Sequence, residues 1–292
     1  MFRGPPPCSD ALPAPQPDAV LRPTLWGHCH WVWRAETIGD AVRDTGSFGP
    51  VEEVRAALRY LGPSSHLVDV GTNVGLVSAA ALAIGHNVTC FEAERHNADL
   101  LRATLALNNW TARATVVDRA VVANSYKTRQ VAFRRWDAGN RGGSRIVKST
   151  AVGSTLVPTT QLDLWASQLP SSVPVVMKID IEGCEHGALR GAKRKLLPRV
   201  DVVISEISPR AMVACGGNAS GYARLLQRHG FTEVSVSGHR HGGFPELFAA
   251  IQHAESEKCR KTCSMLDATF WRPRKTMVAR LSHRIWQWQS GR

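Results

Sequence analysis

The residues of this chain best suited to binding a ligand are the glycines and acids of the run Asp69-Val-Gly-Thr-Asn-Val-Gly75. The apolar residues His66–Val70 before it predict a short buried strand, and Leu76–Ile84 after it predict an Ala-rich helix. A second apolar strand, Asn87–Phe91, delivers Glu92 at its C-terminal end. A glycine turn lets the backbone approach a ligand, and an acid about 20 residues further on binds ribose hydroxyls. The pattern therefore predicts the first half of a nucleotide-binding α/β unit.

The spacing of the two glycines narrows the range of ligands that the turn could bind. Dinucleotide folds use G-x-G-x-x-G to hold a pyrophosphate, whereas Gly71 and Gly75 are spaced G-x-x-x-G and follow an acid at Asp69. A turn with a carboxylate suits a cationic amine better than two phosphates, and S-adenosylmethionine has an α-amino group, a sulfonium and a ribose. A purely structural tight turn is the alternative. We expect S-adenosylmethionine as cofactor, bound by Asp69, Gly71, Thr72, Asn73, Gly75, Glu92 and, near the end of the next strand, Asp118.

A second acidic run, Lys178-Ile-Asp-Ile-Glu-Gly-Cys-Glu185, follows the apolar strand that begins at Pro174. Ligands of open α/β sheets bind beyond the C-terminal ends of the strands, where Asp180 and Glu182 fall. Methyl transfer from a sulfonium needs positioning and a destination for the acceptor proton. We expect Asp180 and then Glu182 to be catalytic, and Glu206, which ends another strand, to face the same rim. No set of acids and histidines has the spacing of a metal site, so no metal is expected.

These motifs resemble the FkbM family of S-adenosylmethionine-dependent methyltransferases. The family shows D-V-G-A-N-x-G, then F-E-P, then K-I-D-V-E-G-x-E and L-x-G-A. This chain has the first and third motifs at Asp69–Gly75 and Lys178–Glu185, followed by Leu189-Arg-Gly-Ala192. It departs from the second motif at Ala93, where the family has Pro. The resemblance covers roughly residues 37–251. It implies a Rossmann-like, seven-stranded class I methyltransferase fold and O-methylation of a hydroxyl, often on a sugar or polyketide-like acceptor.

The rest of the chain divides by composition. Residues 1–23 contain seven prolines and predict a flexible leader, and residues 24–62 form an aromatic-rich entry segment ending in a helix. Alternating strands and helices over residues 63–252 predict an α/β catalytic domain, with a mostly parallel sheet and helices on both faces. A Gly/Arg-rich basic insert occupies residues 127–158, and a basic tail follows from 253 to 292.

The basic insert and tail together account for the whole net charge of +12. Arginines with aromatics in the insert leave open an alternative function, that of a nucleic-acid-binding protein or RNA methyltransferase. In the tail, Met277, Leu281, Ile285 and Trp288 fall near one helical face, which predicts either peripheral contact with an anionic membrane or packing on the domain. No obligate protein partner is evident.

Composition and cysteine usage suggest the compartment. With 43% hydrophobic and 21% charged residues the chain is an ordinary globular one, and no run reaches the length of a membrane span. The seven cysteines form an odd set without a C-x-x-C pair, and Cys90 and Cys184 fall in predicted core elements. We therefore expect reduced cysteines and an intracellular, cytoplasmic protein.

Overall fold

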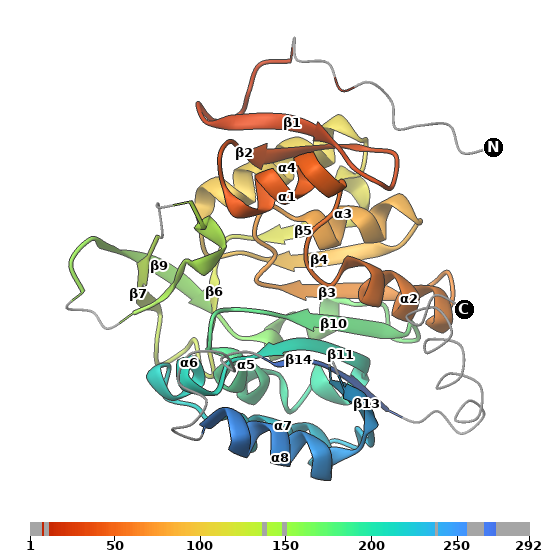
Figure 1. Cartoon of the computed structure of the whole chain (residues 1–292), viewed down its shortest axis with the longest axis vertical. Helices are drawn as coiled ribbons and strands as arrows, with labels where there is room; N and C mark the ends of the chain where they lie inside the picture. Colours follow the sequence, from red (N-terminus) through yellow and green to blue (C-terminus); the bar gives the residue numbers. More distant parts are fainter. Residues whose placement is uncertain are drawn as a thin grey trace.

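A central eight-stranded sheet organises the protein (Figure 1). The computed structural model describes residues 8, 12–135, 139–147, 151–236, 239–255 and 266–272. In spatial order the strands are β13 (His239–Gly242), β12 (Glu233–Val236), β14 (Leu266–Trp271), β11 (Val200–Ile207), β10 (Val175–Ile179), β3 (His66–Val70), β4 (Asn87–Phe91) and β5 (Ala114–Val117). Only β13 and β14 run against the others. The expected α/β fold with a mostly parallel sheet is confirmed, with β13 adding one strand to the expected seven.

Helices cover both faces of this sheet, as expected for alternating strands and helices. One core contains side chains of α2 (Val51–Leu61), α3 (Leu76–Ala83) and α4 (Arg95–Leu107). The other contains side chains of α5 (Glu185–Ala192), α7 (Ala219–Arg228) and α8 (Phe244–Glu255). Strands buried on both faces need continuous apolar runs, and β3 and β10 are buried along their whole length. Two short helices, α1 (Thr37–Thr45) and α6 (Pro209–Ala214), lie near the ends of the strands.

The register of the parallel strands aligns their C-terminal ends. Val70 of β3 pairs with Phe91 of β4 on one side and with Ile179 of β10 on the other. Ile179 in turn pairs with Ser205 of β11. The residues that follow each of these positions therefore form one row along the edge of the sheet: Glu92, Gly71, Asp180 and Glu206.

The basic insert contributes most of a second sheet, which projects from the domain at the left of Figure 1. Its strands are β6 (Ala120–Val121), β9 (Ser154–Thr160), β7 (Gln130–Arg134) and β8 (Arg145–Ile146). A short 3-10 turn, η2 (Arg141–Gly143), connects back toward the central sheet. The sequence pattern of residues 160–168 predicts a helix, and this prediction is wrong. Strand β9 runs to Thr160, and two 3-10 turns follow, η3 (Leu162–Leu164) and η4 (Ala166–Gln168). Two more 3-10 turns are η1 (Thr111–Arg113) and η5 (Leu197–Arg199).

The N-terminal region is more ordered than its proline content suggests. Strand β1 (Ala19–Pro23) lies inside the segment expected to be a flexible leader and pairs with β2 (Cys29–Trp33). The buried His30 ring contacts the Val74 carbonyl oxygen at 3.0 Å, and Trp33 Nε1 donates to Asn97. The β1–β2 hairpin is therefore attached to the glycine turn at Val74 and to α4 at Asn97.

The expectation of reduced cysteines is wrong. Cys8 is disulfide-bonded to Cys29, with Cα atoms 5.7 Å apart, and Cys184 to Cys215, with Cα atoms 5.3 Å apart. Among the described cysteines, Cys90 is free and buried. The sequence lacks a local pairing signal because both bridges join segments that only tertiary folding brings together. The cysteines therefore no longer argue for a reducing compartment.

The C-terminal part of the sheet also differs from expectation. The apolar run Leu247–Ile251 predicts a strand that closes the sheet, but it lies inside α8. The sheet is instead completed by β14, which lies beyond residue 252 and inserts between β11 and β12. Within the described ranges, no helix combines the length and apolar character required to cross a bilayer. The tail residues Met277, Leu281, Ile285 and Trp288 lie outside the described residues.

Candidate functional site

The glycine turn after β3 has the backbone geometry that its sequence predicts. Gly71 has φ +79°, and a Cβ there would overlap the carbonyl oxygen of Asp180, so only glycine fits. Asn73 also has positive φ, which Asn tolerates better than most residues. Gly75, with φ +89°, starts α3, and a Cβ there would overlap Leu101. Gly71 thus allows two strand ends to approach, and Gly75 allows α3 to pack on α4.

Asp69 has a different role from the one its position suggests. Its side chain is fully buried and accepts a 2.6 Å hydrogen bond from Ser78. Its other oxygen lies 3.6 Å from the ammonium of Lys178, which also donates to the carbonyl of Gly71 and lies 3.5 Å from Asp180. Burial alone would lower the pKa of Lys178, but Asp180, Asp69 and Glu92 raise it on balance, so the ammonium stays charged. Asp69 and Lys178 therefore stabilise the glycine turn from its buried side.

Glu92 lies at the position expected of a ribose-binding acid. One carboxylate oxygen accepts from the Asn73 amide at 2.7 Å, and the other accepts from the Glu94 amide at 2.8 Å. Burial raises the pKa of Glu92 to about 7, against the lowering effect of these two hydrogen bonds. Each oxygen still has a lone pair for a ligand hydroxyl. The carboxylate is thus held in one orientation by the same turn that would bind the cofactor.

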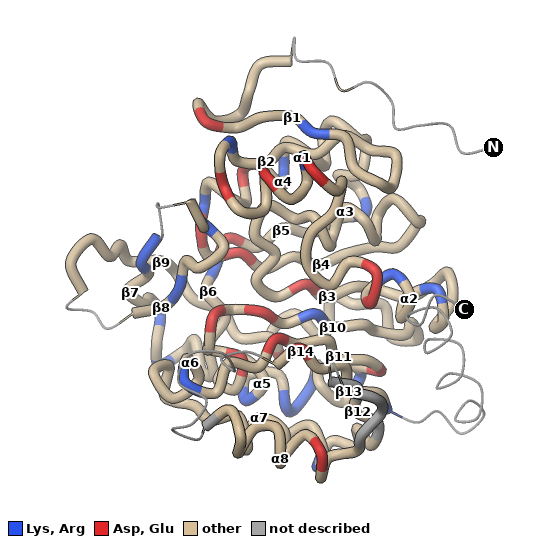
Figure 2. Tube along the Cα trace, viewed as in Figure 1, with Lys and Arg blue, Asp and Glu red and all other residues tan. Residues whose placement is uncertain are grey.

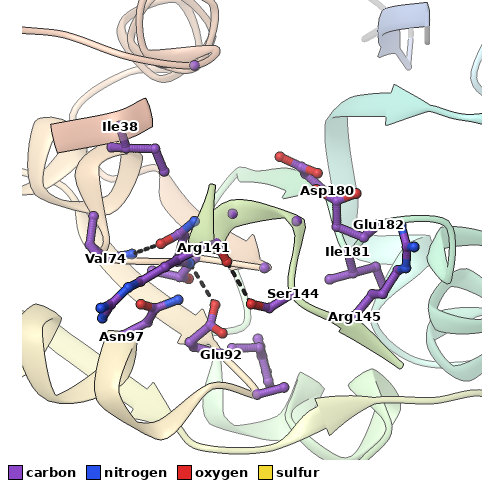
Figure 3. A pocket seen from close by; sticks show the side chains of 18 of the residues that line it. Ile38, Val74, Glu92, Asn97, Arg141, Ser144, Arg145, Asp180, Ile181 and Glu182 are labelled. Atoms are coloured by element: carbon purple, nitrogen blue, oxygen red, sulfur yellow. Dashed lines mark hydrogen bonds between the residues drawn. The ribbon is translucent and has the colours of Figure 1, made fainter. Parts of the chain in front are cut away.

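A cavity of about 490 Å³ opens above this row of strand ends. Figure 3 shows Glu92, Val74 and Asn97 on one side of it and Asp180, Ile181 and Glu182 on the other. Of the residues expected from sequence, those that line the cavity are Gly71, Thr72, Asn73, Glu92, Asp180, Glu182 and Glu206. The cavity is not lined by Asp69, Gly75 or Asp118. Asp118 instead pairs with Arg102 of α4 at 2.5 Å, and its neighbour Arg119 contributes to the lining.

The insert supplies part of the cavity wall, which the sequence did not indicate. Residues 140–146, including η2, line the cavity, and Gly142 lies next to Asn73 of the glycine turn. The Arg141 amide donates to Glu36, and its guanidinium lies 3.8 Å from the Trp33 ring centroid. Thr37 donates from both its amide and its hydroxyl to the carbonyl of Gly139. The insert is thus attached to the entry segment and encloses the cofactor side of the cavity, a contact between residues about 100 positions apart in sequence.

The other side of the cavity is acidic. Asp180, Glu182 and Glu206 come from the ends of β10 and β11 and are each partly exposed. Burial first, and then Asp180 and Glu185, raise the pKa of Glu182 to about 7, while Arg145 lowers it. Burial and the surrounding acids raise the pKa of Glu206 to about 8. Glu182 also has the left-handed φ of +56°, a strained conformation of the kind that clusters at functional sites.

Glu185 shapes the loop between these acids. One of its oxygens accepts from the amides of Ile181 and Gly183, at 2.9 and 3.0 Å. The Cys184–Cys215 disulfide joins this loop to the end of α6, and a Cβ at Gly183 would overlap Ala211. The loop that presents Glu182 is therefore fixed at three neighbouring residues, and Glu185 holds its backbone in place.

The residues around the cavity fit the expected cofactor. Gly71 and Thr72 line the cavity at the turn, and Glu92 offers a buried carboxylate to ribose hydroxyls. The cavity volume lies within the range for cofactor sites, roughly 300–1,000 Å³. The acids on the far side also favour a cationic sulfonium and amine over a pyrophosphate.

Three solved structures illustrate what the chain is similar to. They are a putative RNA methyltransferase from Pyrococcus horikoshii (15% identity, 76% of this chain and 83% of that chain, TM-score 0.37), a SAM-dependent methyltransferase from Agrobacterium tumefaciens (9%, 89% and 71%, 0.45) and a SAM-dependent O-methyltransferase from Thermotoga maritima (11%, 85% and 76%, 0.40). At these scores and identities they carry no argument about substrate. No curated protein matches the chain.

The family model for the methyltransferase FkbM domain matches residues 69–233, more than half of the chain. The match begins at the glycine turn and includes Glu92, Asp180, Glu182 and Glu206. The chain therefore belongs to the FkbM methyltransferase family and is an S-adenosylmethionine-dependent methyltransferase.

Proposed function

We propose that this enzyme methylates a hydroxyl oxygen of an uncharged acceptor, a sugar or another small molecule or glycan. The observation that carries the proposal is the acidic wall of Asp180, Glu182 and Glu206 across the cavity from Glu92. Carboxylates accept hydrogen bonds from hydroxyls and can orient a polyol. In this proposal Glu92 and the glycine turn hold the cofactor, and Asp180 and Glu182 hold the acceptor beside its methyl group.

Methyl transfer is an in-line displacement, so the main requirement is that the acceptor oxygen is held close to the methyl carbon. S-adenosylmethionine supplies the methyl group on a sulfonium, which is already a good leaving group. Asp180 is suited to orienting the acceptor because it follows a buried strand and is itself held by Lys178. A second group is then needed to take the hydroxyl proton.

Charge argues against the alternative of an RNA acceptor. A phosphate backbone approaching this wall would meet Asp180 and the ionised forms of Glu182 and Glu206, whose like charge costs binding energy. The insert is basic, but the guanidinium of its Arg141 already contacts the Trp33 ring and pairs with Asp18 at 3.7 Å. Its guanidinium is therefore not presented to solvent as a phosphate contact.

The proposal is tested by incubating the purified enzyme with S-adenosylmethionine labelled on the methyl group and a fractionated lysate. Mass spectrometry of the labelled product identifies the acceptor. We expect an O-methyl ether on a neutral polyol. A labelled nucleic acid, or methylation on nitrogen, would overturn the proposal.

The same assay tests Asp180. Asp180→Asn keeps the shape of the side chain and removes its charge, and we expect turnover to fall by roughly 10²-fold, a typical effect of losing a positioned acid or base. Cofactor affinity should change much less. Asp44→Asn, at the exposed end of α1, is the matched control. Unchanged turnover in Asp180→Asn would exclude the proposed role.

A further inference from the structure

We propose that Glu206 is the general base that takes the proton from the acceptor hydroxyl, while Asp180 and Glu182 orient the acceptor. This inference rests on the proposed function, and it assigns separate roles to three carboxylates that share one wall of the cavity.

The strand register places Glu206 at the edge of the sheet that lines the cavity. Ser205 pairs with Ile179, so Glu206 lies beside Asp180 at the ends of neighbouring parallel strands. Asp180 in turn lies next to Gly71, whose turn belongs to the cofactor side. Glu206 lines the same cavity and is half-buried, so an acceptor between it and the cofactor turn would contact both.

The three acids differ in their neighbours. The carboxylate of Asp180 has the Lys178 ammonium at 3.5 Å, and Glu182 is attracted by Arg145. Within the described part of the chain, the Glu206 carboxylate has neither an ion pair nor a hydrogen bond. The largest charge effects on it among the described residues come from acids, namely Asp180 and Glu182 beside β10, Asp267 of β14 and Glu185 of α5. Of the three carboxylates, Glu206 is therefore the one whose neighbouring charges most favour binding a proton.

Its basicity agrees with this geometry. Burial and then the four acids raise the pKa of Glu206 to about 8. A general base works best when its pKa lies near the working pH, because it is then both ionised and able to hold the proton. Glu182, at about 7, is a weaker base in the same wall.

The step balances with these groups alone. Glu206 accepts the hydroxyl proton as an electron pair of that oxygen forms the new bond to the methyl carbon. The carbon–sulfur bond breaks with its electron pair staying on sulfur, so the products are the methyl ether, the neutral thioether form of the cofactor and protonated Glu206. Glu206 then returns the proton to solvent through the open side of the cavity.

The first experiment measures transfer of labelled methyl from S-adenosylmethionine to methyl α-glucoside, a simple hydroxyl probe, as a function of pH. In the wild type the rate should rise with pH and level off above about 8. Glu206→Gln should lower the plateau by roughly 10²- to 10⁴-fold and remove the inflection. Cofactor affinity, measured by calorimetry, should stay within about twofold. Glu53→Gln, an exposed acid of α2, is the matched control.

The second experiment needs no acceptor. In protein labelled with ¹³C at the glutamate carboxyls, one resonance should titrate near pH 8 and be absent in Glu206→Gln. An unchanged pH profile in Glu206→Gln, or a spectrum with no such resonance, overturns the assignment. If the wild type methylates no hydroxyl probe but the resonance is present, the proposed acceptor fails while Glu206 retains the required basicity.

Discussion

At the scale of single residues, the site contains acids whose burial in the folded protein disfavours their charged form. Glu92 is buried and Glu182 and Glu206 are half-buried, and the pKa of each is raised to between about 7 and about 8. Unpaired buried charge normally destabilises a fold, so these acids indicate function at the expense of stability. By contrast Asp69, although fully buried, is paired with Lys178 and Ser78 and stabilises the turn.

We expect Glu92→Ala to weaken cofactor binding by roughly 1–3 kcal/mol, the usual contribution of hydrogen bonds to a charged group. The physical reason is that a ribose hydroxyl would lose its carboxylate acceptor. Calorimetric titration with S-adenosylmethionine and its demethylated product measures the change, with Glu53→Ala as the control. Equal affinity in Glu92→Ala and the wild type would show that the ribose binds elsewhere.

The same acids predict how stability depends on pH. Their pKa values are higher in the folded protein than the ordinary 4.5, so the folded state binds more protons than the unfolded chain above pH 4.5. Stability contributed in this way is present at low pH and is lost as pH rises toward about 8. Burial lowers the pKa of His28 to about 3 and of His30 to about 4, which opposes the trend below about pH 6.5.

Above about pH 6.5 these histidines no longer oppose the acids. We expect the melting temperature to fall between pH 6.5 and 8.5, and to fall less in Glu206→Gln. After allowance for solvent screening, the free energy of unfolding that the wild type loses over this interval should exceed the loss in Glu206→Gln by roughly 1–3 kcal/mol. Scanning calorimetry in matched buffers measures it. A melting temperature that rises over this interval would contradict the prediction.

At the scale of elements, tight backbone contacts position the site. The turn after β3 meets the end of β10 at Gly71, and the loop after β10 is attached to α6 through Gly183 and a disulfide. These contacts set the distance between the cofactor side and the acceptor side of the cavity. Changes in them should disturb stability and binding together.

Gly71→Ala should destabilise the fold by roughly 2–4 kcal/mol, because it combines a positive φ with overlap on a backbone carbonyl. Gly85→Ala is a matched control, since Gly85 has φ +97° but open space around its Cβ position. It should cost only the conformational strain, roughly 1 kcal/mol. Denaturant unfolding of both variants measures the difference, and equal values would show that the β3–β10 contact is unimportant.

The two disulfides should be found in the isolated protein. Non-reducing peptide mapping should detect Cys8 bonded to Cys29 and Cys184 bonded to Cys215. Each closes a loop of 21 or 31 residues, so reduction should cost roughly 2–4 kcal/mol per bridge. Cys90 is buried and should react with thiol reagents only after unfolding. Free thiols at Cys184 and Cys215 in native protein purified without reductant would contradict the structure.

At the scale of the whole molecule, one cavity is built from distant parts of the chain. The entry segment, the glycine turn, the insert and the ends of β10 and β11 all line it. Figure 2 shows acidic segments around the loops at this end of the central sheet, with basic segments on the projecting second sheet. The insert thus brings basic residues, among them Arg141 and Arg145, next to the acids that line the cavity.

Truncation tests which part of the C-terminus the domain requires. Removing residues after Pro273 keeps β14 and Arg272, which donates to Leu197 and lies 4.9 Å from the Phe231 ring centroid. This variant should fold and bind cofactor as the full chain does. Removing residues from 266 onward deletes β14 from between β11 and β12, and that variant should not fold. A folded protein without β14 would contradict the sheet order.

The longer variant also distinguishes the two hypotheses for the tail. Loss of binding to anionic vesicles, with an unchanged melting temperature, would indicate a helix that lies on a membrane. A lower melting temperature, with no vesicle binding by the full chain, would indicate packing on the domain.

Local sequence patterns determined much of this protein. The apolar runs ending at Val70, Phe91 and Ile179 predict parallel strands because their side chains are buried on both faces, and the glycine turn with Glu92 predicts a nucleoside site. Asp180, Glu182 and Glu206 could be placed at the same rim because parallel strands end at the same edge. These inferences succeed because strand length, turn geometry and sheet direction depend on neighbouring residues.

Only the tertiary structure decided the rest. The burial of Asp69, the enclosure of the cavity by Arg141 and its neighbours, and both disulfides depend on contacts between residues far apart in the chain. The insertion of β14 between β11 and β12 is of the same kind. No local pattern encodes such contacts, because their stability comes from how whole elements pack. The difference in basicity between Glu182 and Glu206 likewise arises from which charges packing brings near each one.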